Sequence, residues 1–553
     1  MFFPLLKAVS GEHATASMEM GNLAYLVHGI EQLGVSMTLT TILLFMVAFF
    51  CFKGLAKYLQ EIYLIILRQR FIKNIRTTLL NLMRQLNFKY FITSDVGRIQ
   101  NTMTGEVERV SNAFHFYMKT LQEGIMVAVY ISFAFILDPG FAILVCIGGG
   151  LTTLLYRALY KRTQEASRQL TDHNSTYQGE VLQLMGHFKY LKATGNASLY
   201  TRRLKNTVHA VEQSRREIGM LTSIATAVRE PMLVTIVAIV IFFQIRFFDG
   251  AIGAIIVSLL FFYRSLTSLT SMQQCWNFFL EFSGSLENMK CFQYELQHHQ
   301  QDKKTVKAQP FTRAIHLNNV DLYYGDKKIL HDITLTIARN QSIALVGESG
   351  SGKSTLVNLI SGLLTPDTGT ILIDDQDLSL LDLESYQQQL GYVSQDPVIF
   401  NDSIFNNVTF WADYTEETLT RFNKAVKQAR LKDFIHQLHH QEHTLLGNNG
   451  ITLSGGQRQR ISIARELYKE VDILMLDEAT SALDSETEGE IQASIDRLKG
   501  HYTLIIIAHR LATIKNVDQI VMMANGRIQR IGTFTELLTH EPEFKRIVKL
   551  QTL

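Results

Sequence analysis

This chain of 553 residues has few cysteines and a net charge close to zero. The cysteines stand far apart, with neither a disulfide pattern nor metal-ligand spacing, and this usage fits a reducing cytosol together with a membrane. We expect Cys51, Cys146, Cys275 and Cys291 to be buried as small apolar residues. A formal net charge of +2 leaves no overall field strong enough to indicate nucleic-acid binding, so no nucleic-acid partner is predicted.

Charged residues are also few, and apolar residues take their place. Charged side chains make up 19% of the chain against 47% hydrophobic residues, and the mean hydropathy is +0.07. This composition excludes an ordinary soluble enzyme unless much of the chain lies in lipid. The length predicts more than one domain. Because the apolar excess ends near Phe292, the sequence predicts a membrane domain at 1–292, a polar linker at 293–313 and a second domain at 314–553.

Four or five apolar segments are candidates for membrane-spanning helices, which need about 20 mostly apolar residues. The segments are Met37–Leu55, Glu123–Leu137, Phe141–Leu159, Met232–Phe248 and Ala251–Leu269. Lys57–Lys119 and Lys161–Arg229 between them are rich in Lys and Arg, whereas Ala8–Val35 has neither, so the long segments are predicted to be cytoplasmic. Their helical periodicity predicts that they extend the membrane helices well beyond the bilayer.

The start of the chain is then predicted to lie outside. Met1–Leu6 is too short to span, so either the chain begins outside or a first span is truncated. Between Gly21 and Leu33, apolar residues recur at helical spacing and predict a short amphipathic helix on the outer surface. Packing of this segment against neighbouring spans is the alternative.

A phosphate loop opens the second domain. A strand-like run, Ser342–Val346, precedes the glycine-rich segment Gly347-Glu348-Ser349-Gly350-Ser351-Gly352-Lys353-Ser354-Thr355, and a helix-like run follows it. Glycines there let backbone N–H groups turn toward phosphate oxygens at the positive end of the helix. Lys353 supplies a charge to the β- and γ-phosphates and Ser354 a hydroxyl for Mg²⁺, so ATP and Mg²⁺ are the predicted cofactors. A chance glycine-rich turn would lack the flanking strand and helix.

Two adjacent carboxylates end a second strand-like run, Ile473–Leu476. Successive side chains on a strand alternate in direction, so the two acids are expected to have different roles. We assign Asp477 to the magnesium shell and Glu478 to the attacking water as general base. Capping of the next helix is the alternative for this pair.

With these motifs in place, the chain resembles the ATP-binding cassette (ABC) transporters over nearly its whole length. Leu453–Gln457, with Ser454, Gly455, Gly456 and Gln457, is similar to the family signature, Gln395 to its Q-loop residue, Ser481–Asp484 to its D-loop and His509 to its switch histidine. Tyr324 stands where the family stacks an aromatic ring on adenine, with Tyr323 as the alternative.

The resemblance implies an exporter-type helical membrane domain with several spans, followed by an α/β P-loop NTPase domain. It also implies a homodimer in which Ser454 and Gly456 touch the γ-phosphate bound by the other chain. Lys353, Gln395, Glu478 and His509 are the implied catalytic residues, and Ser354, Gln395 and Asp477 the implied metal ligands. The chain departs from many exporters at Asn448, where they carry a glutamate, and in lacking a complete first span.

The resemblance further implies ATP-driven alternating access in a cell inner membrane, with the ATP-binding domain in the cytoplasm. Thr104–Val110 and Ala197–Thr201 fall where the family places its coupling helices. The outer helix favours a lipid-linked or amphipathic cargo by analogy with flippases. A multidrug or peptide exporter is the nearest alternative, and a nucleotide-gated channel or a soluble mechanical ATPase belongs to another class.

Overall fold

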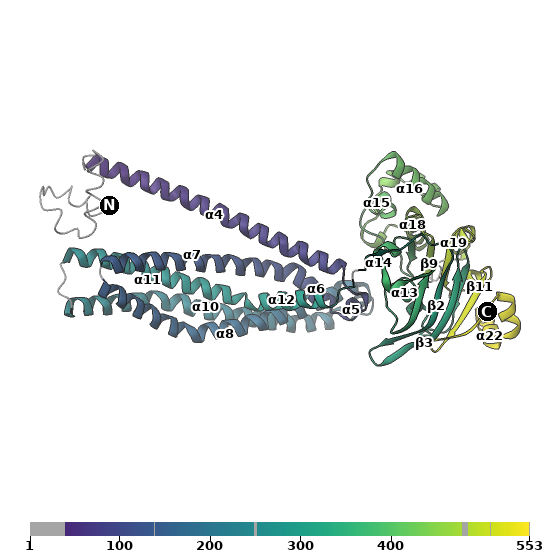
Figure 1. Cartoon of the computed structure of the whole chain (residues 1–553), viewed down its shortest axis with the longest axis horizontal. Helices are drawn as coiled ribbons and strands as arrows, with labels where there is room; N and C mark the ends of the chain where they lie inside the picture. The colour runs from purple at the N-terminus through teal and green to yellow at the C-terminus, as the bar shows by residue number, and fades with distance from the viewer. Residues whose placement is uncertain are drawn as a thin grey trace. The chain divides into compact units, whose positions relative to one another are not determined.

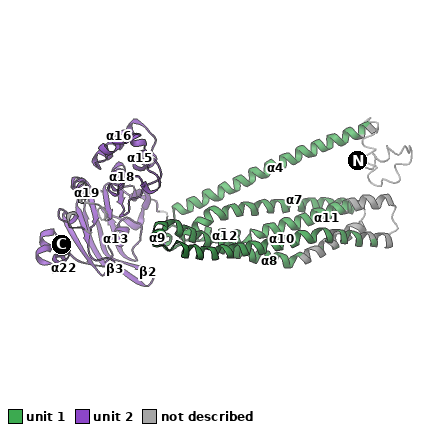
Figure 2. Ribbon diagram, turned by 180° about the vertical axis from the view of Figure 1, so that it is seen from behind, with its two compact units in different colours: residues 1–86, 90–300 green, residues 87–89, 301–553 purple. Residues whose placement is uncertain are grey.

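The apolar first half of the chain folds into long helices, and the second half into sheets covered by helices (Figure 1). The chain is seen in a computed structural model that describes residues 39–137, 139–247, 252–302, 304–477, 485–508 and 510–551. It divides into two units, residues 1–86 with 90–300 and residues 87–89 with 301–553 (Figure 2).

Five long helices build the first unit within the described residues: α4 (Leu39–Arg84), α7 (Val107–Leu137), α8 (Pro139–Gly186), α10 (Ala197–Phe247) and α11 (Ile252–Glu281). A shorter helix, α12 (Ser283–His298), follows α11 and reaches into the segment predicted as a linker. The prediction that the cytoplasmic segments extend the membrane helices is confirmed. In α10, for example, the helix runs from Met232 back to Ala197 without a break.

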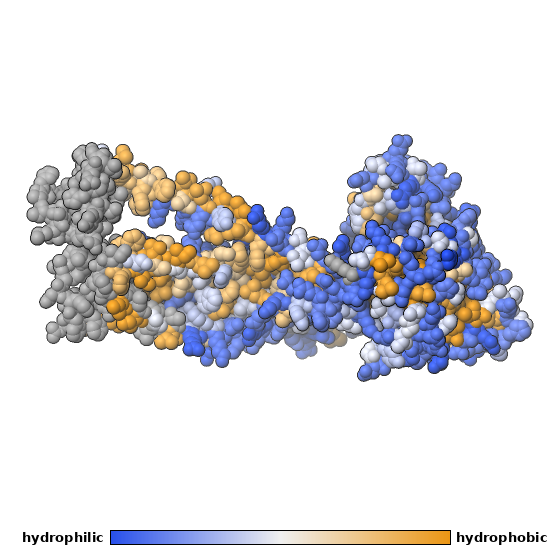
Figure 3. All heavy atoms as spheres, in the orientation of Figure 1, coloured by the Kyte–Doolittle hydropathy of each residue, from blue (hydrophilic) through white to orange (hydrophobic). Residues whose placement is uncertain are grey.

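Apolar side chains cover the surface of the first unit where the membrane spans are predicted. Two helices in the described part of the chain, Leu43–Arg84 and Ala197–Ile239, are long and apolar enough to cross a membrane. Figure 3 shows hydrophobic surface over α4 and the adjacent ends of α7 and α11, whereas the ends of these helices near α12 are hydrophilic. On α4 this surface includes Leu44, Val47, Phe49, Phe50, Phe52 and Leu55.

Short helices stand between the long ones: α5 (Phe88–Thr93), α6 (Val96–Asn101), the π-helix η2 (Thr102–Glu106) and α9 (Phe188–Ala193). Neither segment expected to be a coupling helix is a separate short helix, because Thr104–Val110 lies at the junction of η2 with α7 and Ala197–Thr201 is the first turn of α10. The chain turns earlier than predicted. Gly195 adopts a positive φ of 71° just before α10, and the Asp95 side chain caps α6 by accepting from the N–H groups of Gly97 and Arg98.

The central sheet of the second unit has six strands in the order β12-β11-β4-β10-β9-β8, all parallel except β12. Its strands are β4 (Ser342–Val346), β8 (Leu390–Val393), β9 (Ile473–Asp477), β10 (Thr503–Ile507), β11 (Gln519–Ala524) and β12 (Arg527–Gly532). Apolar side chains of β4, β9 and β10 are buried throughout, as continuous apolar runs predict for a sheet covered on both faces.

A second, antiparallel sheet has the order β3-β2-β5-β6, and a short parallel pair joins β1 to β7. These strands are β1 (Val306–Lys307), β2 (Ala314–Tyr324), β3 (Lys327–Ala338), β5 (Thr368–Ile373), β6 (Gln376–Asp377) and β7 (Leu381–Asp382). The helices are α13 (Lys353–Ile360), α14 (Leu383–Gln387), α15 (Ile404–Thr409), α16 (Glu416–Gln428), α17 (Lys432–Gln437), α18 (Gly455–Tyr468), α19 (Ser485–Leu498), α20 (Leu511–Ile514), α21 (Phe534–His540) and α22 (Pro542–Gln551).

None of the three cysteines with a described side chain is fully buried, and the side chain of Cys146 lies outside what the structure describes. Cys51 and Cys291 are exposed on the single chain and Cys275 is half-buried, and none of the three is in a disulfide. Our prediction of burial was therefore wrong for Cys51 and Cys291. Cys51 lies on the hydrophobic surface of α4, where an apolar surrounding would come from lipid rather than from this chain.

One prediction for the helical unit is that the close contact between α6 and α8 tolerates no added side chain. A Cβ atom at Gly97 would stand 2.3 Å from the Cα of Gly179, which is backbone and cannot move aside. We expect Gly97→Ala to destabilise the protein by about 1–3 kcal/mol, because the two helices must separate. Melting temperatures in detergent test this, with Gly54→Ala as the control, since no atom lies within 4 Å of a Cβ there. Equal melting of the two variants would contradict the predicted close contact.

Candidate nucleotide-binding site

Four neighbouring parallel strands bring the separate sequence motifs to one edge of the central sheet. Gly347 follows β4, Ser394 follows β8, Asp477 ends β9 and Ala508 follows β10. Since the carboxyl ends of parallel strands lie at the same edge, these residues gather there although the chain separates them widely. Glu478, His509 and the D-loop continue from two of these strands but lie outside the described residues.

The phosphate loop has a backbone that only glycine can supply at its ends. Gly347 has a φ of 159° and Gly352 a φ of 100°. A Cβ atom would stand 2.1 Å from the carbonyl oxygen of Met523 at Gly347, and 2.7 Å from the Leu330 side chain at Gly352. The loop is thus pressed between β3 and β11, and it leads directly into α13 at Lys353.

Lys353 is held inside the loop and is only 6% exposed. Its Nζ donates hydrogen bonds to the carbonyl oxygens of Gly347 at 2.8 Å and Glu348 at 2.9 Å. Ser354 is exposed on the first turn of α13, and the buried Ser351 hydroxyl has no hydrogen-bond partner within the described chain. The cation and the hydroxyls therefore stand at the helix N-terminus, where phosphate oxygens are stabilised.

Asp477 has a neighbour that the sequence did not reveal as functional. The hydroxyl of Tyr392, on β8, donates to Oδ2 of Asp477 at 3.1 Å. Burial first, and then the Asp477 carboxylate, raises the pKa of Tyr392, so the hydroxyl stays protonated and remains a donor. In the sequence, the one indication of a functional role for Tyr392 is its position two residues before Ser394, on a strand that leads to Gln395. Gln395 is exposed beyond the end of β8.

The two tyrosines considered for adenine stacking lie in the antiparallel sheet and face opposite ways, because strand side chains alternate. Tyr324 packs against the core of that sheet, and the Nζ of Lys89 lies 5.8 Å from its ring centroid. Lys328 lies 5.6 Å from the ring centroid of Tyr323. Both rings thus have a cationic neighbour, and Tyr324 stays the predicted adenine contact.

The signature segment is shaped by a reciprocal cap at the start of α18. The Ser454 hydroxyl accepts from the N–H of Gln457, and the Gln457 side chain accepts from the N–H of Ser454 at 2.9 Å. The helix begins at Gly455, directly after the capping serine. No hydrogen bond or ion pair between described residues joins this segment to the phosphate loop of the same chain.

The donor set at the sheet edge fits a magnesium nucleotide. Carboxylate and hydroxyl oxygens, as in Asp477 and Ser354, are the ligands that Mg²⁺ takes in proteins, usually together with phosphate oxygens. The glycines of the loop leave its backbone N–H groups open to those phosphates, and Lys353 supplies a compensating charge beside them.

Comparison with known proteins identifies the family of both domains. Residues 9–273 match the ABC transporter transmembrane region and residues 330–481 match the ABC transporter family. The heterocyst differentiation ATP-binding protein HepA of Nostoc sp. is 30% identical over 85% of this chain and 77% of its own length. The ATP-dependent lipid A-core flippase of Psychrobacter cryohalolentis is 29% identical over 89% of this chain and 82% of its own.

A solved structure has the same fold. A bacterial Atm1-family ABC exporter with ATP bound superposes with a TM-score of 0.83 over 100% of this chain and 95% of the other, at 23% identity. The two family matches place a membrane region and a cassette in one chain, with the ATP-binding domain in the cytoplasm. This chain therefore belongs to the ABC transporters, as an exporter-type half-transporter whose ATP hydrolysis is coupled to transport.

Proposed function

We propose that two copies of this chain form a homodimer that moves a lipid-linked or amphipathic molecule across a cell inner membrane by alternating access. The observation that carries the dimer is the placement of the motifs. Each chain has one phosphate loop and one signature, and no hydrogen bond or ion pair between described residues joins them within the chain. A symmetric pair supplies each phosphate loop with the signature of the other copy.

The chemistry at each composite site follows from the roles of this chain's residues. Lys353 and the loop backbone hold the phosphates, while Ser354, Gln395 and Asp477 hold Mg²⁺, which draws negative charge from the reacting phosphate. Ser454 and the N-terminus of α18 close the site from the partner copy. The predicted general base, Glu478, then takes a proton from the attacking water.

Transport in this proposal comes from the long continuous helices of the membrane unit. Closing two cassettes on ATP would draw together the cytoplasmic ends of α4, α7, α8 and α10, and rigid helices carry such a displacement along their length. The membrane halves would then turn from inward-facing to outward-facing, and hydrolysis would reset them.

An amphipathic cargo is favoured by two observations. The relatives from Psychrobacter and Salmonella typhimurium are named ATP-dependent lipid A-core flippases. The exposed apolar side chains of α4 within the predicted span, such as Val47 and Phe50, also form a hydrophobic surface that a molecule with apolar chains could contact from the bilayer (Figure 3). A multidrug or peptide exporter is the second candidate.

Prediction for the dimer uses two inactive variants. Lys353→Ala disables the phosphate loop and Ser454→Arg disables the signature, so each homodimer has no intact site. Mixed dimers contain one intact site, made from the phosphate loop of one variant and the signature of the other. Co-expression at equal levels should restore ATP turnover to about a quarter of the wild-type rate, since half of the dimers are mixed. Turnover that stays at the level of the single variants would contradict the composite site.

A second prediction is that the hydrogen bond from Tyr392 to Asp477 supports magnesium binding. Tyr392→Phe should raise the Mg²⁺ concentration for half-maximal ATP hydrolysis about tenfold, because groups that orient a metal ligand typically contribute this much to metal affinity. ATP binding without Mg²⁺ should not change. Tyr414→Phe is the matched control, since its hydroxyl also bonds to a carboxylate, Glu442, at 3.1 Å. An unchanged Mg²⁺ dependence in Tyr392→Phe would remove this role.

Prediction for the cargo uses sealed proteoliposomes with a fluorescent anionic lipid in the leaflet facing the cassettes. The wild-type protein should move the lipid to the other leaflet when ATP and Mg²⁺ are present, measured by chemical quenching of the exposed dye. Glu478→Gln should bind ATP but lose most of this movement. If ATP hydrolysis instead drives a soluble dye to accumulate in the proteoliposomes and moves no lipid, the result would favour a multidrug exporter.

A further inference from the structure

Three ionisable side chains on separate helices lie at nearly the same depth of the first unit, beyond the predicted membrane spans. Arg109 is near the start of α7, Arg215 is in α10 and Glu281 ends α11. At 1.5 Å per helical residue, each stands roughly 18–25 Å along its helix from the nearest predicted span. These groups are therefore placed in the cytoplasmic extensions, where water and soluble ions have access.

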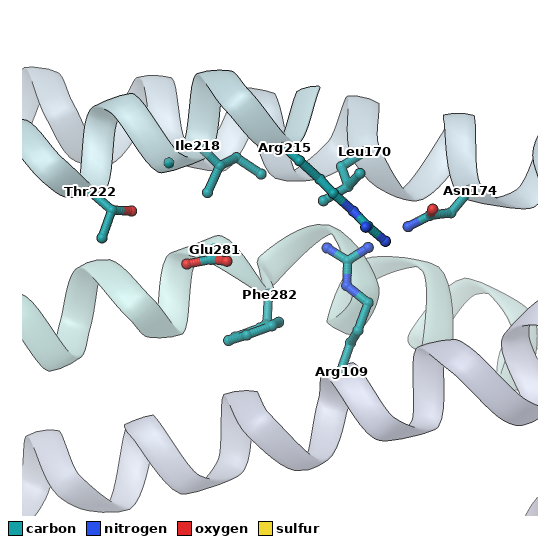
Figure 4. A pocket seen from close by; sticks show the side chains of 9 residues that line it. Arg109, Leu170, Asn174, Arg215, Ile218, Thr222, Glu281 and Phe282 are labelled. Carbon is teal, nitrogen blue, oxygen red and sulfur yellow. The ribbon is translucent and has the colours of Figure 1, made fainter. Parts of the chain in front are cut away.

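These residues line a cavity of about 460 Å³ between the helices (Figure 4). Its wall is completed by Leu170 and Asn174 of α8, by Ile218, Gly219 and Thr222 of α10, and by Phe282. One end is therefore cationic and the other largely apolar. Glu281 alone among the lining residues is acidic, and Figure 4 shows it beside Phe282 rather than between the two arginines.

The two guanidinium groups point toward one another across the cavity, with the Asn174 amide beside them (Figure 4). Arg109 has a side chain only 15% exposed, and its Nη1 is buried without a hydrogen-bond partner among the described residues. The nearest carboxylate oxygen, of Glu106, lies 3.8 Å away, which is an ion pair but too long for a hydrogen bond. Arg215 is 58% exposed at the mouth and pairs with Glu212 at 3.2 Å.

Arg109 has carboxylates nearby, but its buried Nη1 forms no hydrogen bond with them. Burial lowers the pKa of Arg109, Glu106 and Glu281 raise it, and the facing Arg215 lowers it again. Burial raises the pKa of Glu281, and the charge of Arg109 lowers it. Arginine does not give up its proton in proteins, so facing guanidinium groups are stabilised chiefly by an anion between them.

The far end of the cavity differs in chemistry. The Thr222 hydroxyl is buried there without a hydrogen-bond partner in the described chain, next to the apolar side chains of Ile218 and Phe282. A ligand that satisfies both ends carries an anionic head and a short body with both apolar and hydrogen-bonding groups. Water alone could bond to Thr222, but it would not neutralise the facing arginines.

We propose that this cavity, defined by Arg109, Arg215 and Asn174, is a binding site for a phosphate monoester, with the phosphate between the two guanidinium groups. Guanidinium binds phosphate through paired N–H donors, and two such groups facing each other match its several oxygens. The monoester is either the headgroup of a lipid that reaches out of the cytoplasmic leaflet or a soluble metabolite.

The site does not rest on the cargo proposed above. If lipid translocation fails while phosphate binding at Arg109 and Arg215 is found, the proposed function falls and the site stands. If lipid is translocated but the arginine variants bind phosphate like the wild type, the site falls alone.

The test uses the full-length protein, free of nucleotide, in nanodiscs. One arm titrates glycerol 3-phosphate into phosphatidylcholine nanodiscs by calorimetry. The other measures retention of phosphatidic acid by native mass spectrometry, from nanodiscs that contain both lipids. We expect saturable binding in at least one arm, and at least tenfold weaker binding for Arg109→Gln and Arg215→Gln, because each removes a charge-assisted pair of hydrogen bonds. Binding of glycerol 3-phosphate alone would indicate a soluble metabolite, and binding of phosphatidic acid alone would indicate a lipid headgroup.

Two further variants make the result specific. Arg216→Gln removes the same charge one residue away, on a side chain that does not line the cavity, and should bind like the wild type. Arg109→Lys keeps the positive charge but loses the paired N–H donors of the guanidinium group, so it should bind more weakly than the wild type. Since Arg215 is at the exposed mouth, Arg215→Gln keeps the test valid even if Arg109→Gln unfolds. No saturable binding in either arm, or equal binding by Arg215→Gln and Arg216→Gln, would overturn the proposal.

Discussion

The common direction of β4, β8, β9 and β10 is the constraint on which the nucleotide site depends. Because these strands are parallel and in register, the residues that follow them leave the sheet at one edge, although the chain separates the first, Gly347, widely from the last, Ala508. A shift of β9 by one residue would turn Asp477 to the other face and break its hydrogen bond to Tyr392. Burial of both faces of β9 and β10 excludes such a shift, since it would bring Asp477 into the apolar core.

The hairpin of β11 and β12 fixes the phosphate loop from the other side. The N–H of Gly526 donates to the carbonyl oxygen of Ser351, and a Cβ at Gly526 would stand 2.1 Å from the carbonyl oxygen of Ile329. The loop therefore has backbone within contact distance on two sides, and its shape is set before a phosphate arrives. A pre-organised site loses little conformational entropy on binding, so more of the interaction energy appears as affinity.

Much of this architecture could be predicted from local sequence, and what could not depends on contacts between distant segments. The phosphate loop was predictable because its glycines, Lys353 and the flanking strand and helix are adjacent in the chain. The long helices followed from periodicity in the same way. Pairing of Tyr392 with Asp477 could not be predicted, since it requires the order of strands in the sheet. The bounds of the short helices could not be predicted because helical periodicity continues through turns that only Gly195 and Asp95 reveal.

The same distinction explains why the facing arginines were missed, and what they imply for motion. Helical periodicity tells which face of α7 or α10 carries a residue, but not how far one helix has slid along another. In this fold α7 packs mainly on α11 and α8 mainly on α10, so Arg109 and Arg215 belong to different helix pairs. An anion that contacts both arginines binds more tightly when the two helix pairs are in contact than when they are apart. It therefore shifts the conformational equilibrium toward the state in which the pairs meet. Without it, repulsion between the guanidinium groups favours separation of the pairs, so the phosphate monoester and the cassettes would act on one conformational equilibrium.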